Sequence, residues 1–280
     1  MKKILEISQL GKSYPTPSGG EAVIVKNFNL DIQEGEFVSI LGHSGCGKST
    51  VLSIVMGLSE LSYGGVILGG REIDGPGIDR GVVFQAACLF PWFSVIENIL
   101  ISIDQVHNLK TKKEKRELAQ YYLKLVGLEG SENRYPNEMS AGMRQRVGIA
   151  RAFAMEPKIL LLDEPFSLLD ALTRLELQSQ LTRIWEQDKK TVLMVTHDVD
   201  EALFLSDRIV MMTSGPAAGI GKIISVPFDR PRDQAQLFNH PDYFWMRDRL
   251  TNFLEDQSHQ KKDREASGEE RVKMEAVVDQ

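Results

Sequence analysis

The stretch Phe37–Thr50 reads FVSILGHSGCGKST and decides the fold. It begins with an apolar run, Phe37–Leu41, of the length of a buried strand, and the residues that follow, Gly42–Thr50, fit the pattern G-x-x-x-x-G-K-[ST]. Small residues let the backbone curl so that successive N–H groups point inward at phosphate oxygens, and a following helix adds the positive end of its dipole. We therefore predict a strand, a phosphate-binding loop and a helix through Val51–Met56.

The residues of this loop have separate expected tasks. Lys48 is expected to reach the β- and γ-phosphates of a nucleotide, Ser49 to offer its hydroxyl to Mg²⁺, and Thr50 to donate to a further phosphate oxygen. A glycine-rich turn without a ligand is the alternative, and the strand before the loop and the helix after it argue against that alternative. The predicted nucleotide-binding residues of the loop are Gly42, His43, Ser44, Gly45, Cys46, Gly47, Lys48, Ser49 and Thr50.

Short apolar runs alternate with longer helical patterns along the chain, which indicates a mostly parallel sheet with crossover helices. Ligands of such α/β sheets bind outside the carboxyl ends of the strands, so the residues that follow each run are candidates for chemistry. Besides Phe37–Leu41, the predicted buried strands are Val82–Phe84, Ile159–Leu162, Val192–Thr196 and Ile209–Thr213.

Two of these strands end at ionisable side chains. Asp163 and Glu164 follow the run Ile159–Leu162, and carboxylates at a buried edge need partners. We expect Asp163 to hold Mg²⁺ and Glu164 to orient and deprotonate an attacking water. His197 follows another strand and is a candidate for contact with the γ-phosphate, although a structural histidine would be the alternative for this residue taken alone. A phosphate loop by itself does not separate GTPases, kinases, helicases and transport motors.

Length and composition set outer limits on the class of protein. The 280 residues, 42% apolar and 26% charged, are typical of a soluble globular protein of one or two domains and exclude fibrous and wholly disordered classes. A net charge of −6 argues against a broadly basic nucleic-acid binder but is compatible with a local anion site.

No segment looks like a membrane span or a leader. Apolar runs stop at about five residues, far short of the roughly 18 to 20 that cross a bilayer. Glu6 interrupts the apolar N-terminal stretch, so we expect no signal peptide and a cytoplasmic location. Cys46 and Cys88 predict neither a disulfide framework nor a zinc site.

Composition and the spacing of apolar residues divide the chain into segments. We expect an α/β core at about 1–90 and 155–225, interrupted by a helical subdomain at about 91–154 in which charged residues alternate with apolar ones at helical spacing. A C-terminal extension follows at about 226–254. Residues 255–280 are rich in Lys, Arg, Glu, Asp and Gln and lack aromatic residues, so we expect a disordered tail.

These features resemble a known family once Ser140–Arg146, which reads SAGMRQR, is added to the phosphate loop, Asp163-Glu164 and His197. Over Ile4–Leu254 the chain is similar to the ATP-binding subunit of an ATP-binding cassette (ABC) transporter. The resemblance implies an α/β fold with a P-loop NTPase (RecA-like) core, a helical subdomain insertion and a small antiparallel β subdomain. It also implies ATP and Mg²⁺ as cofactors and ATP hydrolysis coupled to transport.

Further site residues come from the resemblance alone. Tyr14 stands where the family has an aromatic residue that stacks on adenine, and Gln85 matches the glutamine that joins the Mg²⁺ site to the transmembrane partner. Asp170 ends the run Ser167–Asp170, which matches the loop that couples two ATP sites. His197 matches the switch histidine, so the resemblance gives Glu164, His197 and Gln85 catalytic roles and Ser49, Gln85 and Asp163 roles at the metal.

The resemblance further implies a head-to-tail dimer, either of two identical or of two different cassettes. Each ATP would lie on the phosphate loop of one subunit and be capped by Ser140, Ala141, Gly142 and Met143 of the other. Ala141 replaces the usual first glycine of this motif. We expect it to be tolerated if φ is negative there, and to strain the site by about 1 kcal/mol or more if φ is positive.

A narrower resemblance concerns the cargo. The runs DEPFSLLDALTR, THDVDEAL, SGPAAGIG and FDRPR are similar to those of the nitrate, sulfonate, taurine and bicarbonate importers, and Gly215–Gly221 and Pro241–Leu254 are closest to the nitrate and bicarbonate members. The implied cargo is a small anion, with nitrate first, bicarbonate or nitrite next, and sulfonate, taurine or cyanate as alternatives. The implied partners are permease subunits and, indirectly, a periplasmic or lipid-anchored solute-binding protein, at the cytoplasmic face of the inner membrane.

Two questions stay open at the level of sequence. The apolar cluster Leu89–Phe93 could be core packing or part of the groove that receives a permease helix. The rival functions are a soluble ABC ATPase that acts on ribosomes or DNA, an ATP-binding regulatory module, and a small-molecule kinase. The single phosphate loop, Glu164, His197 and the Ser140 motif each argue against one of these rivals, and co-purification with a permease would separate them.

Overall fold

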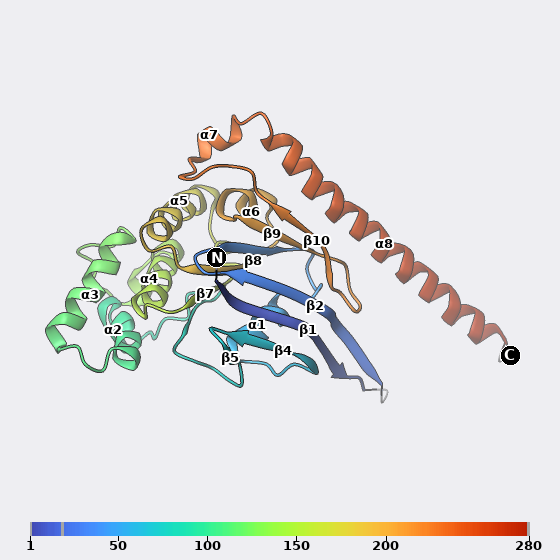
Figure 1. The fold of residues 1–280 in the computed structure, drawn as a ribbon, viewed down its shortest axis with the longest axis horizontal. Coiled ribbons are helices and arrows are strands. Elements are labelled where there is room, and N and C mark those ends of the chain that lie inside the picture. Colours follow the sequence, from blue (N-terminus) through green and yellow to red (C-terminus); the bar gives the residue numbers. More distant parts are fainter. Residues whose placement is uncertain (1, 18–19, 279–280) are drawn as a thin grey trace.

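The computed structural model describes residues 2–17 and 20–278, with side chains as far as residue 260. Two sheets form the body of the molecule, and helices α2, α3 and α4 gather at one end of it (Figure 1). The strands are β1 (Lys3–Pro15), β2 (Glu21–Gln33), β3 (Phe37–Leu41), β4 (Tyr63–Leu68), β5 (Arg71–Glu72), β6 (Arg80–Val83), β7 (Ile159–Asp163), β8 (Thr191–Thr196), β9 (Arg208–Met212) and β10 (Ile220–Ser225). The helices are α1 (Lys48–Met56), α2 (Val95–Val106), α3 (Lys112–Leu125), the short 3-10 helix η1 (Pro136–Glu138), α4 (Ala141–Ala154), α5 (Ala171–Asp188), α6 (Val199–Leu205), α7 (Gln234–Phe238) and α8 (Tyr243–Val278).

The larger sheet has the strand order β10-β9-β3-β8-β7-β6, parallel throughout except for the antiparallel pair β9 and β10. Its central strands are buried on both faces: Phe37 and Leu41 of β3 belong to the core beneath the helices, whereas Val38 and Ile40 belong to the core between the sheets. A strand covered on both faces is apolar without alternation, which is why these runs predicted buried strands. All five predicted strands are present, with ends shifted by one or two residues.

The smaller sheet is antiparallel and has the order β2-β1-β4-β5. It matches the antiparallel β subdomain that the resemblance implied, although no individual strand of it was predicted. The signal was present in β2, where buried Phe28, Leu30 and Ile32 alternate with more exposed polar residues. These side chains pack with those of α1 in the core between the two sheets.

The helical region between β6 and β7 confirms the predicted insertion. Capping boxes begin two of its helices: Ser94 with Glu97 starts α2, and Thr111 with Glu114 starts α3. The helices pack against one another and join the same core as the covered face of the larger sheet. The insertion, which carries Ser140 at the N-terminus of α4, therefore shares a hydrophobic core with the larger sheet.

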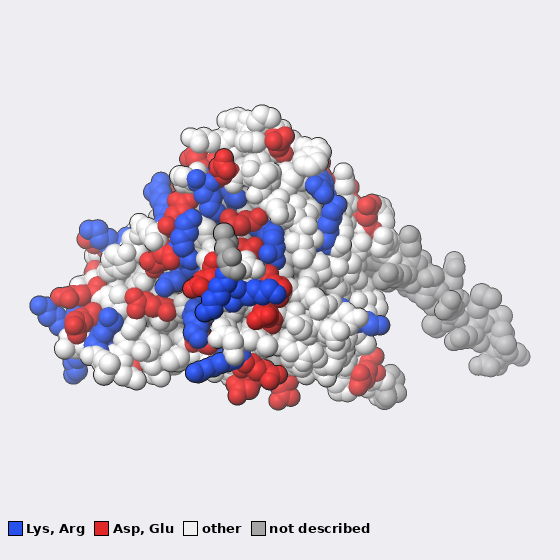
Figure 2. All heavy atoms as spheres, viewed as in Figure 1, with Lys and Arg blue, Asp and Glu red and all other residues white. Residues whose placement is uncertain are grey.

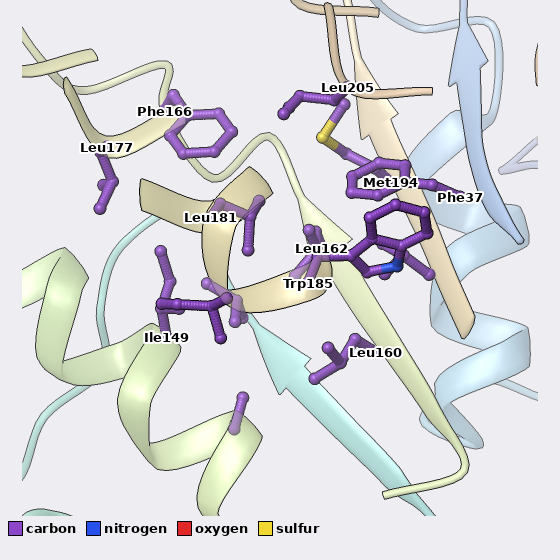
Figure 3. Close-up of a cluster of buried hydrophobic side chains, with 14 of the residues drawn as sticks. Phe37, Ile149, Leu160, Leu162, Phe166, Leu177, Leu181, Trp185, Met194 and Leu205 are labelled. Atoms are coloured by element: carbon purple, nitrogen blue, oxygen red, sulfur yellow. The ribbon is translucent and has the colours of Figure 1, made fainter. Parts of the chain in front are cut away.

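Helix α5 connects the carboxyl edge of β7 with the next strand and carries the largest side chain of the core. Trp185 is buried, stacks edge-on against Phe37 at a centroid distance of 5.9 Å, and donates from its indole N–H to the carbonyl oxygen of Lys190. Leu181 lies beside it, and both side chains are directed among those of β7 such as Leu162 (Figure 3). This packing holds the C-terminal end of α5 against the larger sheet, next to the turn that leads into β8.

The C-terminal region differs from the prediction. Residues 226–254 form the expected extension, with Tyr243, Met246 and Leu250 buried, but α8 then continues through Val278 where we predicted a disordered tail (Figure 1). Lys, Glu, Gln, Arg and Ala are strong helix formers, and extending a helix that already exists is far easier than starting one. Low apolar content ruled out a core in this segment but did not rule out a helix. The side chains beyond residue 260 lie outside the described residues.

The charge distribution agrees with the overall composition. Lys and Arg side chains are interspersed with Asp and Glu across the face shown in Figure 2, and the described side chains on that face form no extended basic stripe of the kind that nucleic-acid binders carry. Within the described helices, none is long and apolar enough to cross a bilayer.

Candidate nucleotide-binding site

The phosphate loop lies between β3 and α1, as predicted, and its lysine is buried. Lys48 Nζ donates hydrogen bonds to the carbonyl oxygens of Gly42, at 2.8 Å, and of His43, at 2.9 Å. A buried ammonium needs such partners. Because an ammonium has three donors and these two carbonyls use two of them, one donor is free for a phosphate oxygen.

The glycines of the loop meet conformational and steric demands. Gly45 and Gly47 have φ values of +79° and +96°, in the left-handed region that other residues rarely adopt. A Cβ on Gly47 would also lie 2.7 Å from Val25 Cγ2 of β2. The smaller sheet therefore contacts the loop directly and stabilises its curled backbone, whose N–H groups point at an anion.

Ser49 and Asp163, which the sequence assigned to the metal, lie together. Ser49 Oγ donates a hydrogen bond of 3.1 Å to Asp163 Oδ1. Burial raises the pKa of Asp163, partly offset by this hydrogen bond, and a divalent cation would favour its charged form. No group of three or more His, Cys, Asp or Glu side chains suited to a metal occurs among the described residues. This pair nevertheless fits Mg²⁺, which takes one or two carboxylates and completes its shell with phosphate oxygens and water.

The structure also brings Glu164 and His197 together at the carboxyl ends of β7 and β8. His197 Nδ1 lies 3.2 Å from Glu164 Oε2, and the imidazole is largely exposed. Glu164 has a φ of 43°, held by the hydrogen bonds from its N–H to Val195 and from Ser167 Oγ to its carbonyl oxygen. Left-handed backbone at a glutamate costs about 1 to 2 kcal/mol, and strain of this kind concentrates at functional sites. Nothing in the sequence indicated it.

Gln85 lies in the loop after β6 and connects to this pair through one hydroxyl. Its Nε2 donates to Ser167 Oγ at 3.1 Å, and that hydroxyl donates to the carbonyl oxygen of Glu164 at 2.9 Å. Gln85, Ala141 and Leu169 line one small cavity. The loop after β6, the start of α4 and the loop before α5 are therefore neighbours. The structure gives Gln85 no direct contact with Ser49 or Asp163 among its described hydrogen bonds.

Ser140 caps α4, and its hydroxyl accepts the N–H of Met143 at 3.2 Å. Ala141 is the first helical residue and has a negative φ, so its methyl group is accommodated as we expected under that condition. Gly142 has no such freedom, because a Cβ there would overlap Cγ2 of Thr173 in α5. The backbone at position 141 therefore does not require glycine, whereas the packing at Gly142 does.

Tyr14 and Asp170 come from other elements of the fold, β1 and the start of α5. Tyr14 is 43% exposed on β1, with Lys12 Nζ 4.8 Å from its ring centre, so one aromatic surface is available for stacking. Asp170 caps α5 by accepting the N–H of Thr173. In the described part of the chain, no hydrogen bond links Ser140 or Asp170 to the loop Gly42–Thr50.

Two contacts at the site were not predicted. His43 Nε2 lies 2.6 Å from the carbonyl oxygen of Leu254, so the phosphate loop touches α8. Arg174 of α5 bonds to Asp198, the residue after His197, and to the carbonyl oxygen of Leu169, the residue before Asp170. The bonds from His43 to Leu254 and from Arg174 to Asp198 join residues 211 and 24 positions apart, and local patterns carry no signal for them.

Comparisons with known proteins agree with this geometry. The family model described as "ABC transporter" matches residues 25–167. The bicarbonate transport ATP-binding protein CmpD of Synechocystis is 50% identical over 89% of this chain and 88% of its own length. The nitrate import ATP-binding protein NrtD of Synechococcus elongatus is 48% identical over 89% of this chain and 91% of its own length.

A solved structure gives the same result for the fold. The dimeric, post-hydrolysis structure of the ATP-binding cassette MJ0796 bound to ADP and Pi matches with a TM-score of 0.71 and 32% identity, covering 81% of this chain and 100% of that chain. The chain therefore belongs to the ABC transporter family, and its fold is that of an ATP-binding cassette.

Proposed function

We propose that this chain hydrolyses ATP in a pair of cassettes and thereby drives the import of nitrate or bicarbonate through a membrane permease. The contact between Glu164 and His197, beside the phosphate loop, is the observation that carries the hydrolytic function. The cargo is supported by the relatives at 50% and 48% identity, whose names concern bicarbonate and nitrate transport. Nitrate is the first candidate, and nitrite follows from the same chemistry of a small planar anion.

The proposed hydrolysis divides the work among these residues. The loop amides and Lys48 hold the phosphates, while Glu164 orients the attacking water and accepts its proton. His197 holds the carboxylate of Glu164 and the γ-phosphate in one geometry. Ser49 and Asp163, with Gln85 at the edge, are the residues that would hold Mg²⁺, which when bound neutralises the charge that develops on the phosphates.

The second cassette supplies the rest of the site in this proposal. The N-terminus of α4, with Ser140, Ala141, Gly142 and Met143, offers backbone N–H groups and a hydroxyl to an anion. Because these groups have no hydrogen bond to this chain's own phosphate loop, they suit the γ-phosphate held by another subunit. The dimeric state of MJ0796 supports the pairing. In the proposed pair, Asp170 lies between the two sites and Tyr14 stacks on adenine.

The permease would bind beside Gln85. Trp92 is 66% exposed, although Phe90 and Phe93 pack against its ring at centroid distances of 5.6 and 6.2 Å. Asn98 holds the turn beneath it through the N–H and C=O of Phe90 and the C=O of Phe93. This built presentation of an exposed indole favours a docking role over core packing. In this proposal the chain works at the cytoplasmic face of the membrane, and the permease links it indirectly to a solute-binding protein.

Reconstitution with a permease that co-purifies with this chain tests the proposed function. Glu164→Gln keeps the shape of the side chain but removes the base, so ATPase activity should fall about a hundredfold or more while ATP binding persists. Uptake of nitrate, bicarbonate, taurine and cyanate into proteoliposomes would then rank the cargoes. Failure to co-purify with any permease would favour a soluble ABC ATPase or a regulatory module instead.

A further inference from the structure

Glu201, in the first turn of α6, is a buried carboxyl group behind the switch histidine. Its side chain is 5% exposed and lies outside every role assigned above. Oε2 makes a short hydrogen bond with the hydroxyl of Thr196, and Oε1 accepts Nε2 of Gln178 from α5 at 3.1 Å. Gln178 is itself contacted by Gln234 Nε2 at 3.2 Å. The carboxyl group therefore ties β8, α5 and α6 together at one point.

The hydrogen bonds of Thr196 hold the chain on both sides of His197. Thr196 precedes the histidine, and its Oγ1 also accepts the N–H of Asp198, the residue after it, at 3.1 Å. Asp198 in turn accepts the N–H groups of Asp200 and Glu201 and so caps α6. The Thr196 hydroxyl, oriented by Glu201, thus fixes the backbone immediately before and after His197.

The same carboxyl group borders the cavity of the reacting groups. Glu201, Thr196 and His197 line one small cavity together with Glu164 and Ser167. Arg174 and Asp198 also face it, so the charged groups around Glu201 are Arg174, Asp198, Glu164 and the titratable His197. Glu201 itself has no hydrogen bond to the phosphate loop or to Glu164 within the described residues.

Its protonation is unusual for a carboxyl group. Burial, with a smaller contribution from the charge of Asp198, raises the pKa of Glu201 to about 7, although the hydrogen bonds from Thr196 and Gln178 and the nearby Arg174 act to lower it. A buried carboxyl group is costly to keep unless it is hydrogen-bonded, and this one bonds to Thr196 and Gln178.

We propose that Glu201 is a positioning residue for hydrolysis: through Thr196 and the start of α6 it fixes the orientation of His197 toward Glu164. The proposal rests on the roles proposed for His197 and Glu164. A small displacement of His197 would disturb Glu164, which orients the attacking water, and would therefore lower turnover strongly. The phosphate loop, which binds ATP, would be unaffected.

The test uses the full chain and compares Glu201→Met with Glu201→Gln. Methionine fills the volume but cannot bond to Thr196, so kcat should fall about tenfold or more, while KM and the affinity for a fluorescent ATP analogue stay within about twofold. Glutamine can accept from Gln178 and donate to Thr196, so Glu201→Gln should keep kcat within about threefold. Thr182→Val is the matched control, because Thr182 is a buried hydroxyl of α5 whose bond to the carbonyl oxygen of Gln178 is its only side-chain hydrogen bond among the described residues.

Glu164→Gln and His197→Ala, measured in the same assay, distinguish a failure of the proposed hydrolytic site from a failure of the role proposed for Glu201. If either keeps wild-type turnover, the proposed site is wrong. If both lose turnover while Glu201→Met keeps it, the role of Glu201 is wrong. Equal losses of kcat in Glu201→Met and Thr182→Val, or a failure of glutamine to restore turnover in a folded protein, would likewise overturn the positioning role.

Discussion

His43 Nε2 lies 2.6 Å from the carbonyl oxygen of Leu254, which joins the phosphate loop to helix α8. Three residues further along α8, Gln257 bonds to the backbone N–H of Ser214, and the Ser214 hydroxyl donates to the Gln257 carbonyl oxygen. The C-terminal helix is therefore attached to the edge of the nucleotide site at two places.

His43→Ala should loosen this attachment. The loss of one partly buried hydrogen bond is expected to lower the free energy of unfolding by about 1 kcal/mol and to weaken ATP binding slightly. Urea denaturation and equilibrium nucleotide binding measure both effects. His240→Ala, at a more exposed histidine outside the site, serves as the control, and an equal response of the two variants would contradict the link.

The two small residues of the α4 motif should respond in opposite ways. Ala141→Gly removes a methyl group from a helical position with negative φ, so ATPase activity should change by less than about twofold. Gly142→Ala drives a methyl group into Thr173, so we expect a loss of activity of about tenfold or more.

The double variant Gly142→Ala with Thr173→Ser sharpens this test. Serine removes the methyl group that alanine would strike and keeps the hydroxyl, so activity should recover in large part. A strong rise in ATPase rate on Ala141→Gly would instead mean that the natural alanine impairs the capping site.

Trp92→Ala should uncouple transport from hydrolysis. The indole is exposed and lies away from the phosphate loop, so basal ATPase activity should stay within about twofold, while transport should fall about tenfold or more if the permease binds there. Proteoliposome uptake and ATPase rates measure the two. Trp245→Ala is the matched control, since Trp245 is 59% exposed on α8, and equal loss of uptake and basal hydrolysis in Trp92→Ala would count against a docking surface.

Stability should depend on pH through Glu201. Its pKa is raised from 4.5 to about 7 in the folded chain, so between these values the folded state holds a proton that the unfolded state has lost. The stability contribution is complete below pH 4.5 and is lost as pH rises through 7, by about 3 kcal/mol. Urea denaturation at pH 5 and pH 8 should show this loss in the wild type and not in Glu201→Gln; parallel curves would contradict the raised pKa.

The sequence predicted the local parts of this site well. Lys48 and Ser49 belong to one continuous motif, and Asp163 follows an unmistakable buried strand, so their meeting at the sheet edge followed from the rule for parallel strands. The helical insertion and the antiparallel sheet came from the family resemblance, and the structure agrees with both.

What escaped prediction is long-range or conformational. The bond from His43 to Leu254 joins residues 211 positions apart, and Glu201 gained its importance only from burial against α5. The left-handed backbone of Glu164 depends on hydrogen bonds from β8 and from Ser167. The tail was wrongly predicted as disordered because its composition was judged by its lack of a core and not by its helix propensity.

The two hydrogen bonds of Lys48 to the carbonyl oxygens of its own loop have a kinetic consequence. They hold the loop in its curled shape without help from a ligand, so an arriving nucleotide has little chain entropy to remove. Association should then be limited by diffusion and orientation, and the affinity for ATP should be set chiefly by how fast the nucleotide leaves. The phosphate loop is therefore a preformed receptor for the nucleotide.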